Sequence, residues 1–330
     1  MSDPAKFNPK IEPLDLRRVR SIPIAERRNK VRVREFAGVP GPHCTTEELL
    51  ASLPRLLAAD ELRAAAECTA RTIERGAPVV LALGGHVVKA GLAPVIIDLM
   101  ERGCVSALAM NGATAIHDYE IGLIGETSED VTANIADGRF GMARETAVAY
   151  AAAATRAAAA GRGLGEALGA QILAAGHPDF LRHSLLAAAT RLEIPATVHV
   201  ALGTDVVHMH PEMDGAALGA ASLYDFRLLA GIATRLAGGV WMNLGSAVVL
   251  PEIFLKVVNL ARNVGYPLRE LTAINFDMLQ HYRTSVNVLR RPVERGISIT
   301  GHHEINIPLF RVALLLELKR AAARRQTERA

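Results

Sequence analysis

The sequence predicts an α/β fold, a Rossmann-like parallel sheet with helices on both faces. Strand-like and helix-like patterns alternate along most of the 330 residues, which is typical of parallel sheets joined by crossover helices. Half of the residues are apolar, enough to bury a large core. Polar residues and glycines follow the predicted strands, where ligands bind in such sheets.

The first elements form a βαβ unit. Residues 46–76 are predicted to be a helix, with Thr45 or Thr46 as the N-cap and Gly76 closing the last turn. Residues 77–112 then read as strand, glycine turn, helix, glycine stop and second strand. A connection of this kind favours parallel pairing of the two strands.

The same alternation continues to the C-terminus. The later elements predicted from the pattern are helices over 142–160, 164–175 and 179–191, strand 194–202, helix 217–236, strand 238–246, helix 251–265, strand 270–277, and a final strand and helix within 298–325. No repeat or linker divides the chain. We therefore expect an N-terminal arm over residues 1–45 and a single domain over residues 46–330.

Composition restricts the classes of partner. A net charge of +3, from 37 basic and 34 acidic residues, is too small to favour nucleic acid. The basic ends read as solvated arms, with a partner-binding role as the alternative. Three cysteines without close spacing suggest neither disulfides nor a zinc ribbon. The longest apolar tract is broken by Arg156 and no apolar leader is present, so we expect a cytoplasmic protein that does not cross a membrane.

Two early loops carry candidate site residues. In ALGGHVVKAG, residues Gly84, Gly85 and His86 could bring the backbone close to a diphosphate, although many strand-to-helix turns need glycine anyway. The second loop holds Asn111 and Gly112, followed by His117, Asp118 and Glu120. An acid here could bind ribose hydroxyls, act as a base, or only cap the next helix.

A third loop, after strand 194–202, is rich in histidines and acids: His199, Asp205, His208, His210, Glu212 and Asp214. In a strand, His208 and His210 would point to one face, and Glu212 or Asp214 could complete a metal site. Hydrogen bonds to a substrate, or a simple polar loop, are the alternatives.

Three further loops end the later strands. The fourth carries Asn243, Gly245 and Ser246, and the fifth carries Asn275, Asp277, His281, Tyr282 and Arg283. The sixth, in GISITGHHEINIPLF, places His302, His303 and Glu304 between two runs that read as strand. No GxSxG elbow, Walker loop or HExxH helix occurs in the sequence. The common position of the six loops is therefore a stronger signal than any one of them.

The order of these motifs resembles the deoxyhypusine synthase family, which uses NAD to transfer an aminobutyl group from spermidine to a protein lysine. GGHVVKAG stands where that family has TSNxxSSG, and MNGATAIHDYE where it has TAGG followed by paired acids. The stretch from IPATVHVAL to MDGAALG resembles its IPV strand and TDGSLGD, and NLGSAVVLPE resembles its GGGVPK loop. NFDMLQHYRTS resembles its EFDGSDSGA only faintly. The resemblance covers most of residues 70–315.

The sequence departs from that family at the C-terminal loop. The family's SWGKI carries the lysine that forms an imine with the transferred group, whereas SITGHHEI has His302 and His303 and no lysine. Imidazole cannot form that imine, so true deoxyhypusine synthesis is not expected. MNGATAIHDYEIGLIGETSED is also similar to the NAD-binding segment of bifunctional arginine dihydrolase and ornithine cyclodeaminase proteins. Both resemblances imply a bound NAD that borrows hydride at a C–N carbon.

The first hypothesis is thus an NAD-dependent enzyme, of transferase or oxidoreductase type, that acts on a small, polar, amine-bearing substrate and holds no metal. The residues expected to hold NAD are Gly84, Gly85, His86, Asn111, Gly112, Asp118, Asn243, Gly245 and Ser246. The residues expected to face the substrate are His208, His210, Asp214, His302, His303 and Glu304. One imidazole would take the proton released when hydride leaves.

Two other hypotheses stay open. A metal-dependent lyase or hydrolase would hold Zn²⁺ or a similar ion through His208, His210, His302 or His303 and a carboxylate. A non-catalytic nucleotide-binding module is the third, although it would not need so many histidines at strand ends. The family resemblance also implies a homotetramer with sites between subunits.

Overall fold

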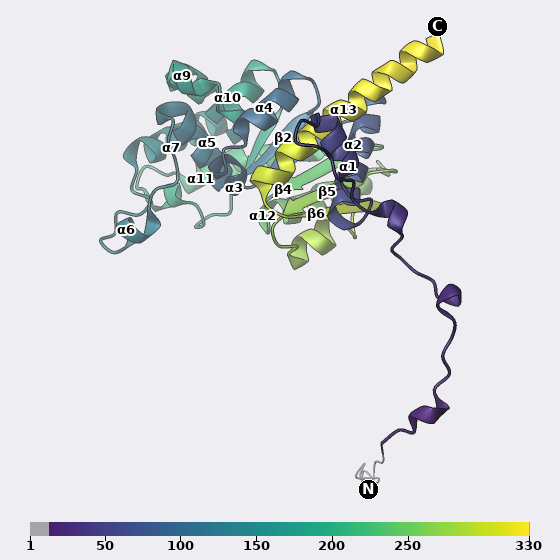
Figure 1. Ribbon diagram of the computed structural model, residues 1–330. Coiled ribbons are helices and arrows are strands. Elements are labelled where there is room, and N and C mark those ends of the chain that lie inside the picture. The colour runs from purple at the N-terminus through teal and green to yellow at the C-terminus, as the bar shows by residue number, and fades with distance from the viewer. Residues whose placement is uncertain (1–12, 330) are drawn as a thin grey trace.

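A computed structural model describes residues 13–329 and contains a six-stranded, fully parallel sheet (Figure 1). Its strands are β1 (Val79–Leu83), β2 (Ala107–Asn111), β3 (Ala196–His199), β4 (Val240–Leu244), β5 (Thr272–Asp277) and β6 (Arg295–Thr300). The spatial order is β3-β2-β1-β4-β5-β6, which is the order of doubly wound dinucleotide-binding folds. The predicted fold class is confirmed.

The strand order reverses between β1 and β4. From β1 the chain builds outward to β2 and β3, and it then returns to β4 and builds outward in the other direction. Val79 to Leu83 pair in register with Val240 to Leu244. All carboxyl ends therefore share one edge of the sheet, and a crevice for ligands is expected where the order reverses.

Helices cover both faces of the sheet. One face is covered by α2 (Leu57–Glu74), α3 (Gly85–Lys89), α4 (Ala93–Glu101), α5 (Gly112–Ile124), α7 (Arg144–Ala160), α8 (Leu164–Ala175), α10 (Leu185–Arg191) and α13 (His303–Arg329). The other face is covered by α12 (Val249–Asn263) and the C-terminal half of α11 (Gly215–Ala233), whose N-terminal half packs into the core of the first face through Leu218 and Ala221. On that second face Trp241 stacks on Phe254, with ring centroids 4.4 Å apart. The sheet is buried on both sides, so β1 is apolar along its whole length.

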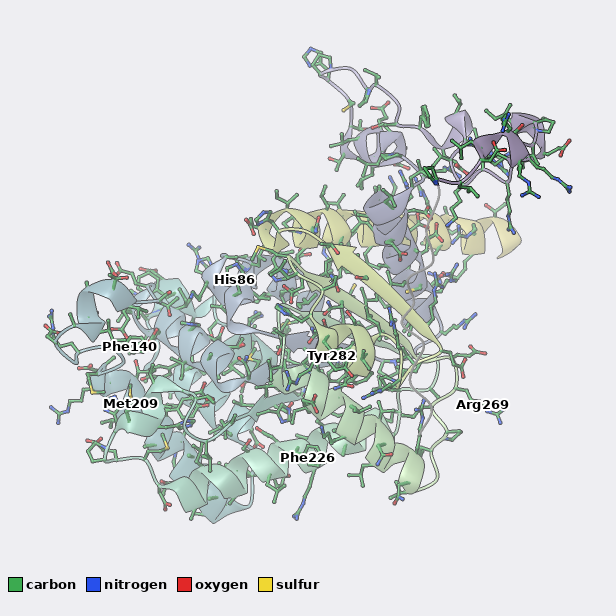
Figure 2. All side chains as sticks on the ribbon, turned by 90° about the horizontal axis from the view of Figure 1, so that it is seen from below. His86, Phe140, Met209, Phe226, Arg269 and Tyr282 are labelled. Atoms are coloured by element: carbon green, nitrogen blue, oxygen red, sulfur yellow. The ribbon has the colours of Figure 1, made fainter. Side chains whose placement is uncertain are left out.

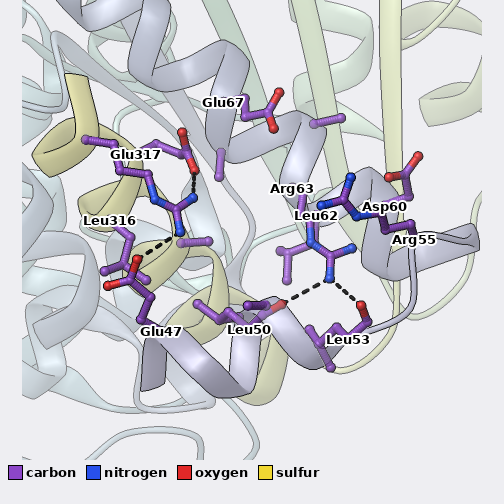
Figure 3. A pocket seen from close by; sticks show the side chains of 15 residues that line it. Glu47, Leu50, Leu53, Arg55, Asp60, Leu62, Arg63, Glu67, Leu316 and Glu317 are labelled. Carbon is purple, nitrogen blue, oxygen red and sulfur yellow. Dashed lines mark hydrogen bonds and ion pairs between the residues drawn. The ribbon is translucent and has the colours of Figure 1, made fainter. Parts of the chain in front are cut away.

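The long helix predicted over residues 46–76 is broken in two. Helix α1 (Thr46–Ser52) starts with a capping box between Thr45 and Glu48, and Pro54 separates it from α2. The guanidinium of Arg63 donates to the carbonyls of Leu50, Leu53 and Pro54, at 2.5 to 3.0 Å. Figure 3 shows this arrangement in a cavity of about 410 Å³ between α1, α2 and α13. Arg63 thus satisfies the carbonyls that the broken helix leaves free.

Two other expected boundaries differ. The helix predicted over 179–191 is α9 (Pro178–Leu181) and α10, separated by Ser184, which caps α10. The strand-like run after the paired histidines belongs to α13, because Ile307, Phe310 and Leu314 bury one helical face against the sheet. A helical spacing of three to four residues explains this burial, which the short run INIPLF alone does not reveal.

The described part of the N-terminal segment is exposed. Residues 13–45 contain three single turns, η1 (Leu16–Arg18), η2 (Ile24–Glu26) and η3 (Val33–Glu35), and run away from the sheet in Figure 1. Residues 1–12 of the expected arm lie outside the described residues. Among the described residues, one helix, α11, is long and apolar enough to cross a membrane, but it lies on the sheet with Leu229, Ala230 and Ala233 buried.

Asp225, on the buried side of α11, joins three elements. Its Oδ2 accepts hydrogen bonds from the backbone of Gly165 at 2.9 Å and Val198 at 2.8 Å. Its Oδ1 has no partner among the described residues. Burial outweighs the backbone donors, which include Leu164 beside Val198 and Gly165, and raises the pKa of Asp225 to about 7. The carboxyl therefore favours its protonated form in the folded protein.

We expect Asp225→Asn to change how stability depends on pH. Because the folded pKa lies above the unfolded one, the wild type is most stable when this group is protonated and loses stability as pH rises through about 7. Relative to Asp225→Asn, the wild type should lose on the order of 2–3 kcal/mol of unfolding free energy between pH 5 and pH 8. Urea unfolding at both pH values measures this difference. The half-exposed Asp137→Asn is the control, and parallel behaviour of the two variants would contradict the expectation.

Candidate functional site

The turns after β1 and β4 touch at the reversal of strand order. The backbone N–H of Gly84 donates to the carbonyl of Leu244 at 2.9 Å. A Cβ on Gly84 would lie 2.2 Å from the Gly245 carbonyl oxygen. Gly84, predicted to make room for a diphosphate, therefore makes room for the neighbouring turn. The helix that follows, α3, has only five residues, so its dipole offers little to an anion.

His303 covers Gly245. Gly245 has a φ of +69°, and a Cβ there would lie 2.7 Å from the His303 Nε2, so glycine is required by both conformation and space. His303 is the first residue of α13 and only 2% exposed. Its ring lies 5.8 Å from that of His86, which Figure 2 shows beside the start of α13. Burial lowers the pKa of His303, with Asp277 acting in the opposite direction. Its Nδ1 has no partner among the described residues.

The expected group of three at residues 302–304 is divided by the helix start. His302 and Glu304 lie on the surface, with side chains 63% and 50% exposed and 3.6 Å between the His302 Nδ1 and the Glu304 Oε1. Only His303 turns inward. Three successive residues at a helix N-terminus point in different directions, so the structure brings one of the three to the strand ends.

A chain of amides lies at the carboxyl ends of β4 and β5. Asn243 donates to the Asn275 Oδ1 at 2.6 Å, and Asn275 donates to the Gln280 Oε1 at 2.7 Å. Asn243 also donates to the Ser246 carbonyl at 2.9 Å. The Ser246 hydroxyl accepts from the backbone of Leu250 at 3.3 Å and so helps to start α12. The Asn243 Oδ1 is buried and has no partner among the described residues.

A second cluster lies beside the ends of β2 and β3. Asn111 caps α5, since its Oδ1 accepts from the backbone and hydroxyl of Thr114 at 2.9 and 2.7 Å. A Cβ on Gly112 would lie 1.9 Å from the Asp205 Oδ2. Asp205 was not assigned to the site from the sequence, although its loop was. Burial raises the pKa of Asp205 to about 6.

His208 belongs to the same cluster. Its Nδ1 accepts from the backbone of Gly203 at 3.1 Å and Asp205 at 3.3 Å, so its proton lies on Nε2. That nitrogen is 3.9 Å from the Asp205 Oδ2, and neither atom has a hydrogen-bond partner among the described residues. Burial lowers the pKa of His208. A buried acceptor and a buried donor thus lie side by side.

The expectation that His208 and His210 share one face of a strand was wrong. They lie at the end of a single 3₁₀ turn, η4 (Val206–Met209), where residues two apart point in different directions. The His210 Nε2 bonds the Gly141 carbonyl at 2.8 Å. Asp214 caps α11 through the backbone of Ala216 and Ala217. Within residues 13–329, no three histidine, cysteine or acidic side chains are grouped as metal ligands, so the structure does not assemble the cluster of the metal hypothesis.

Asp118 has a structural role in place of the expected ribose contact. It is fully buried, and it accepts from the Ser184 hydroxyl at 2.7 Å and from the backbone of Leu185 and Leu186 at 2.6 and 2.9 Å. These donors form the start of α10, 66 to 68 residues away in sequence. Burial raises the pKa of Asp118 to about 6 despite the three donors. Both oxygens are occupied inside the protein, so neither is available to a ligand.

Sequence reasoning missed two residues that complete polar networks. Gln280 ends the amide chain of Asn243 and Asn275. Thr127 joins His117 to Glu120 beside Gly85, since the His117 Nδ1 and the Glu120 Oε2 lie 2.8 and 2.5 Å from its hydroxyl. Both side chains are uncharged. Gln280 lies inside the fifth loop, between Asp277 and His281, and Thr127 follows the second loop by several positions. The only feature of the sequence that could have pointed to these two residues is that polar candidate residues stand near them.

Comparisons with known proteins give a fold and no family. No family model and no curated protein matches the chain. A solved structure described as a putative deoxyhypusine synthase from Entamoeba histolytica is similar over 83% of this chain and 94% of its own, with 13% identity and a TM-score of 0.50. At this identity the likeness shows a shared deoxyhypusine synthase-like fold.

Two other solved structures are similar at lower scores. One is described as a conserved putative LOR/SDH protein from Methanococcus maripaludis S2, with 14% identity, a TM-score of 0.46 and coverage of 86% of this chain and 72% of that one. The other is AgrE in a ternary complex with ornithine and NAD⁺, with 14% identity, a TM-score of 0.49 and coverage of 82% of this chain. This chain spans about a third of the length of AgrE, 35%.

We expect Asp118→Asn to destabilise the fold. An amide turns its NH₂ toward backbone donors, so at least one buried N–H loses its acceptor, and the unfolding free energy should fall by about 2–3 kcal/mol. Urea unfolding measures the loss. Asp130→Asn is a matched control, because Asp130 caps the short α6 (Val131–Ile135) through one exposed bond of 3.1 Å and should cost less than about 1 kcal/mol. Equal losses in the two variants would argue against the buried capping role.

Proposed function

We propose that this chain is an NAD-dependent enzyme that acts on a small, polar, amine-bearing substrate at a C–N carbon. The observation that supports the proposal is the position of buried polar atoms without partners. Four of seven such atoms in the described residues belong to Asp205, His208, Asn243 and His303, beside strand carboxyl ends. Buried polar atoms are nearly always paired, so unpaired ones at a ligand edge indicate atoms that a ligand satisfies.

These atoms fit the polar parts of a dinucleotide. The acceptor of Asp205 and the Nε2 donor of His208 match a hydroxyl, which donates and accepts at once. Asn243 offers an acceptor near the point where the strand order reverses, where dinucleotides bind in such sheets. NAD bound at this edge would accept a hydride and return it.

His303 is the residue proposed to move a proton. Burial lowers the pKa of His303 and so favours the neutral imidazole, which can accept a proton, and nearby Asp277 favours the charged form. The exposed His302 and Glu304 are less suited to this role, because water competes for their hydrogen bonds. With no lysine in SITGHHEI, the covalent imine route of deoxyhypusine synthases is not part of the proposal.

The proposal predicts that Gly245→Ala weakens NAD⁺ binding. The new Cβ would collide with His303 and strain a positive φ, so the affinity should fall about tenfold or more. Isothermal titration calorimetry of the purified protein with NAD⁺ measures this.

Gly238→Ala is the matched control. Gly238 has a similar φ of +66°, lies before β4 at the opposite end of that strand, and has open space around its Cβ position. It should share the strain and keep the affinity. The proposal fails if the wild type does not bind NAD⁺ or if both variants lose affinity equally.

We further propose a cytoplasmic homotetramer with a small-molecule substrate, as the family resemblance implies. Sedimentation equilibrium should then give a mass about four times that of the 35.3 kDa chain. A monomer at all concentrations tested would exclude the tetramer. It would not bear on NAD⁺ binding, which the calorimetry tests separately.

A further inference from the structure

His117 is held by a relay outside the machinery described so far. Its Nδ1 lies 2.8 Å from the Thr127 hydroxyl, which in turn donates to the Glu120 Oε2 at 2.5 Å. The second Glu120 oxygen accepts from the Thr146 hydroxyl of α7 at 3.2 Å. Both carboxylate oxygens are therefore fixed, one by each threonine.

The relay determines which nitrogen of His117 carries the proton. A threonine hydroxyl has one proton, and that of Thr127 points to Glu120. Toward His117, Thr127 can therefore only accept, so Nδ1 must carry hydrogen. In the neutral ring Nε2 is then a bare acceptor. Burial, and secondarily the charge of Lys89 on α3, lower the pKa of His117 to about 4, so the ring is neutral at physiological pH.

The edge of the ring that carries Nε2 lies beside the turn that leaves β1. The His117 Cδ2, which is bonded to Nε2, lies 3.2 Å from where a Cβ on Gly85 would be. Because Gly85 has no side chain, the ring edge stays open against the turn that leaves β1, and the side chain remains 19% exposed. A bare acceptor nitrogen, one bond from Cδ2, therefore lies near the turn where the sequence predicts a diphosphate. A diphosphate offers only acceptors, so it would repel this nitrogen.

We propose that His117 is the residue that recognises the nitrogen of the substrate, by accepting an N–H hydrogen bond at Nε2. Thr127 and Glu120 are positioning residues that keep that nitrogen an acceptor. This inference rests on the proposed function, because it assigns a contact for the amine of that reaction. It also assigns the turn after β1, which the sequence predicts to bind the cofactor, to substrate binding.

The charges around His117 favour an uncharged amine. Two charged groups lie around the ring. Lys89 on α3 lowers the pKa of His117 by its charge, and the Glu120 Oε2 on α5 lies 4.0 Å from Nδ1. Glu120 faces the Nδ1 side through Thr127, whereas Lys89 repels a second cation. A neutral amine is also the form whose lone pair can assist loss of hydride from the adjacent carbon. The site thus selects the reactive protonation state of its substrate.

The first test concerns the ring alone and needs no ligand. In protein labelled with ¹⁵N-histidine, the His117 signals are identified by their loss in His117→Asn. The wild type and Thr127→Ser should show a protonated Nδ1 and a bare Nε2. Thr127→Val, which replaces the hydroxyl by a methyl of similar size, should shift the proton toward Nε2. A bare Nδ1 in the wild type would overturn the assignment.

The second test measures amine binding to the NAD⁺-saturated protein by calorimetry, with L-ornithine and spermidine as probes. Thr127→Val and His117→Asn should bind the better probe about tenfold more weakly than the wild type and Thr127→Ser, with NAD⁺ affinity unchanged. Affinity should rise with pH toward the pKa of the amine. Equal affinity in Thr127→Val, or no binding of either probe to the NAD⁺-saturated wild type, would overturn the inference. Failure of the wild type to bind NAD⁺ would instead reject the proposed function. The ¹⁵N measurement would still show which nitrogen of His117 carries the proton.

Discussion

The contact between the turns after β1 and β4 is the constraint on which the rest of the site depends. The Gly245 carbonyl occupies the space of a side chain at Gly84, and His303 occupies the space of one at Gly245. Three segments far apart in sequence thus pack at one point, without room for a single added carbon. Position 245 also needs a left-handed conformation. The placement of α13, and with it of the buried imidazole, follows from this stack of turns.

The fold was predictable because its central strands are fully buried and therefore stand out in the sequence as short apolar runs. The runs VVLAL and VWMNL are buried on both faces. They are apolar except for Asn243, and a sequence shows such runs directly. The break of the predicted helix at Pro54 was harder to predict. It is stabilised by Arg63, which lies on α2 and donates to the carbonyls at the end of α1, and the sequence does not show this contact. The face of α13 was ambiguous for a similar reason: a six-residue apolar run fits a strand or a helix until its partners are known.

The candidate site was predictable by loop and not by residue. The six loops do follow the strands, but a sequence does not show which polar side chain turns inward. Asp118 lies one helical position from His117, yet it caps a helix more than 60 residues later while His117 faces the β1 turn. Likewise His303 is buried between two exposed neighbours. Such choices depend on helix phase and on distant partners, neither of which leaves a local pattern.

The stacked pair Trp241 and Phe254 has a consequence for observing this protein. Trp241 is the single tryptophan of the chain and lies two positions before Asn243 on β4. It is fully buried on the face opposite the histidines, and its indole N–H has no partner among the described residues. Tryptophan fluorescence therefore arises from this one buried side chain on β4. The emission can follow changes in the packing of β4 without an added label, and without a second signal from the exposed N-terminal segment.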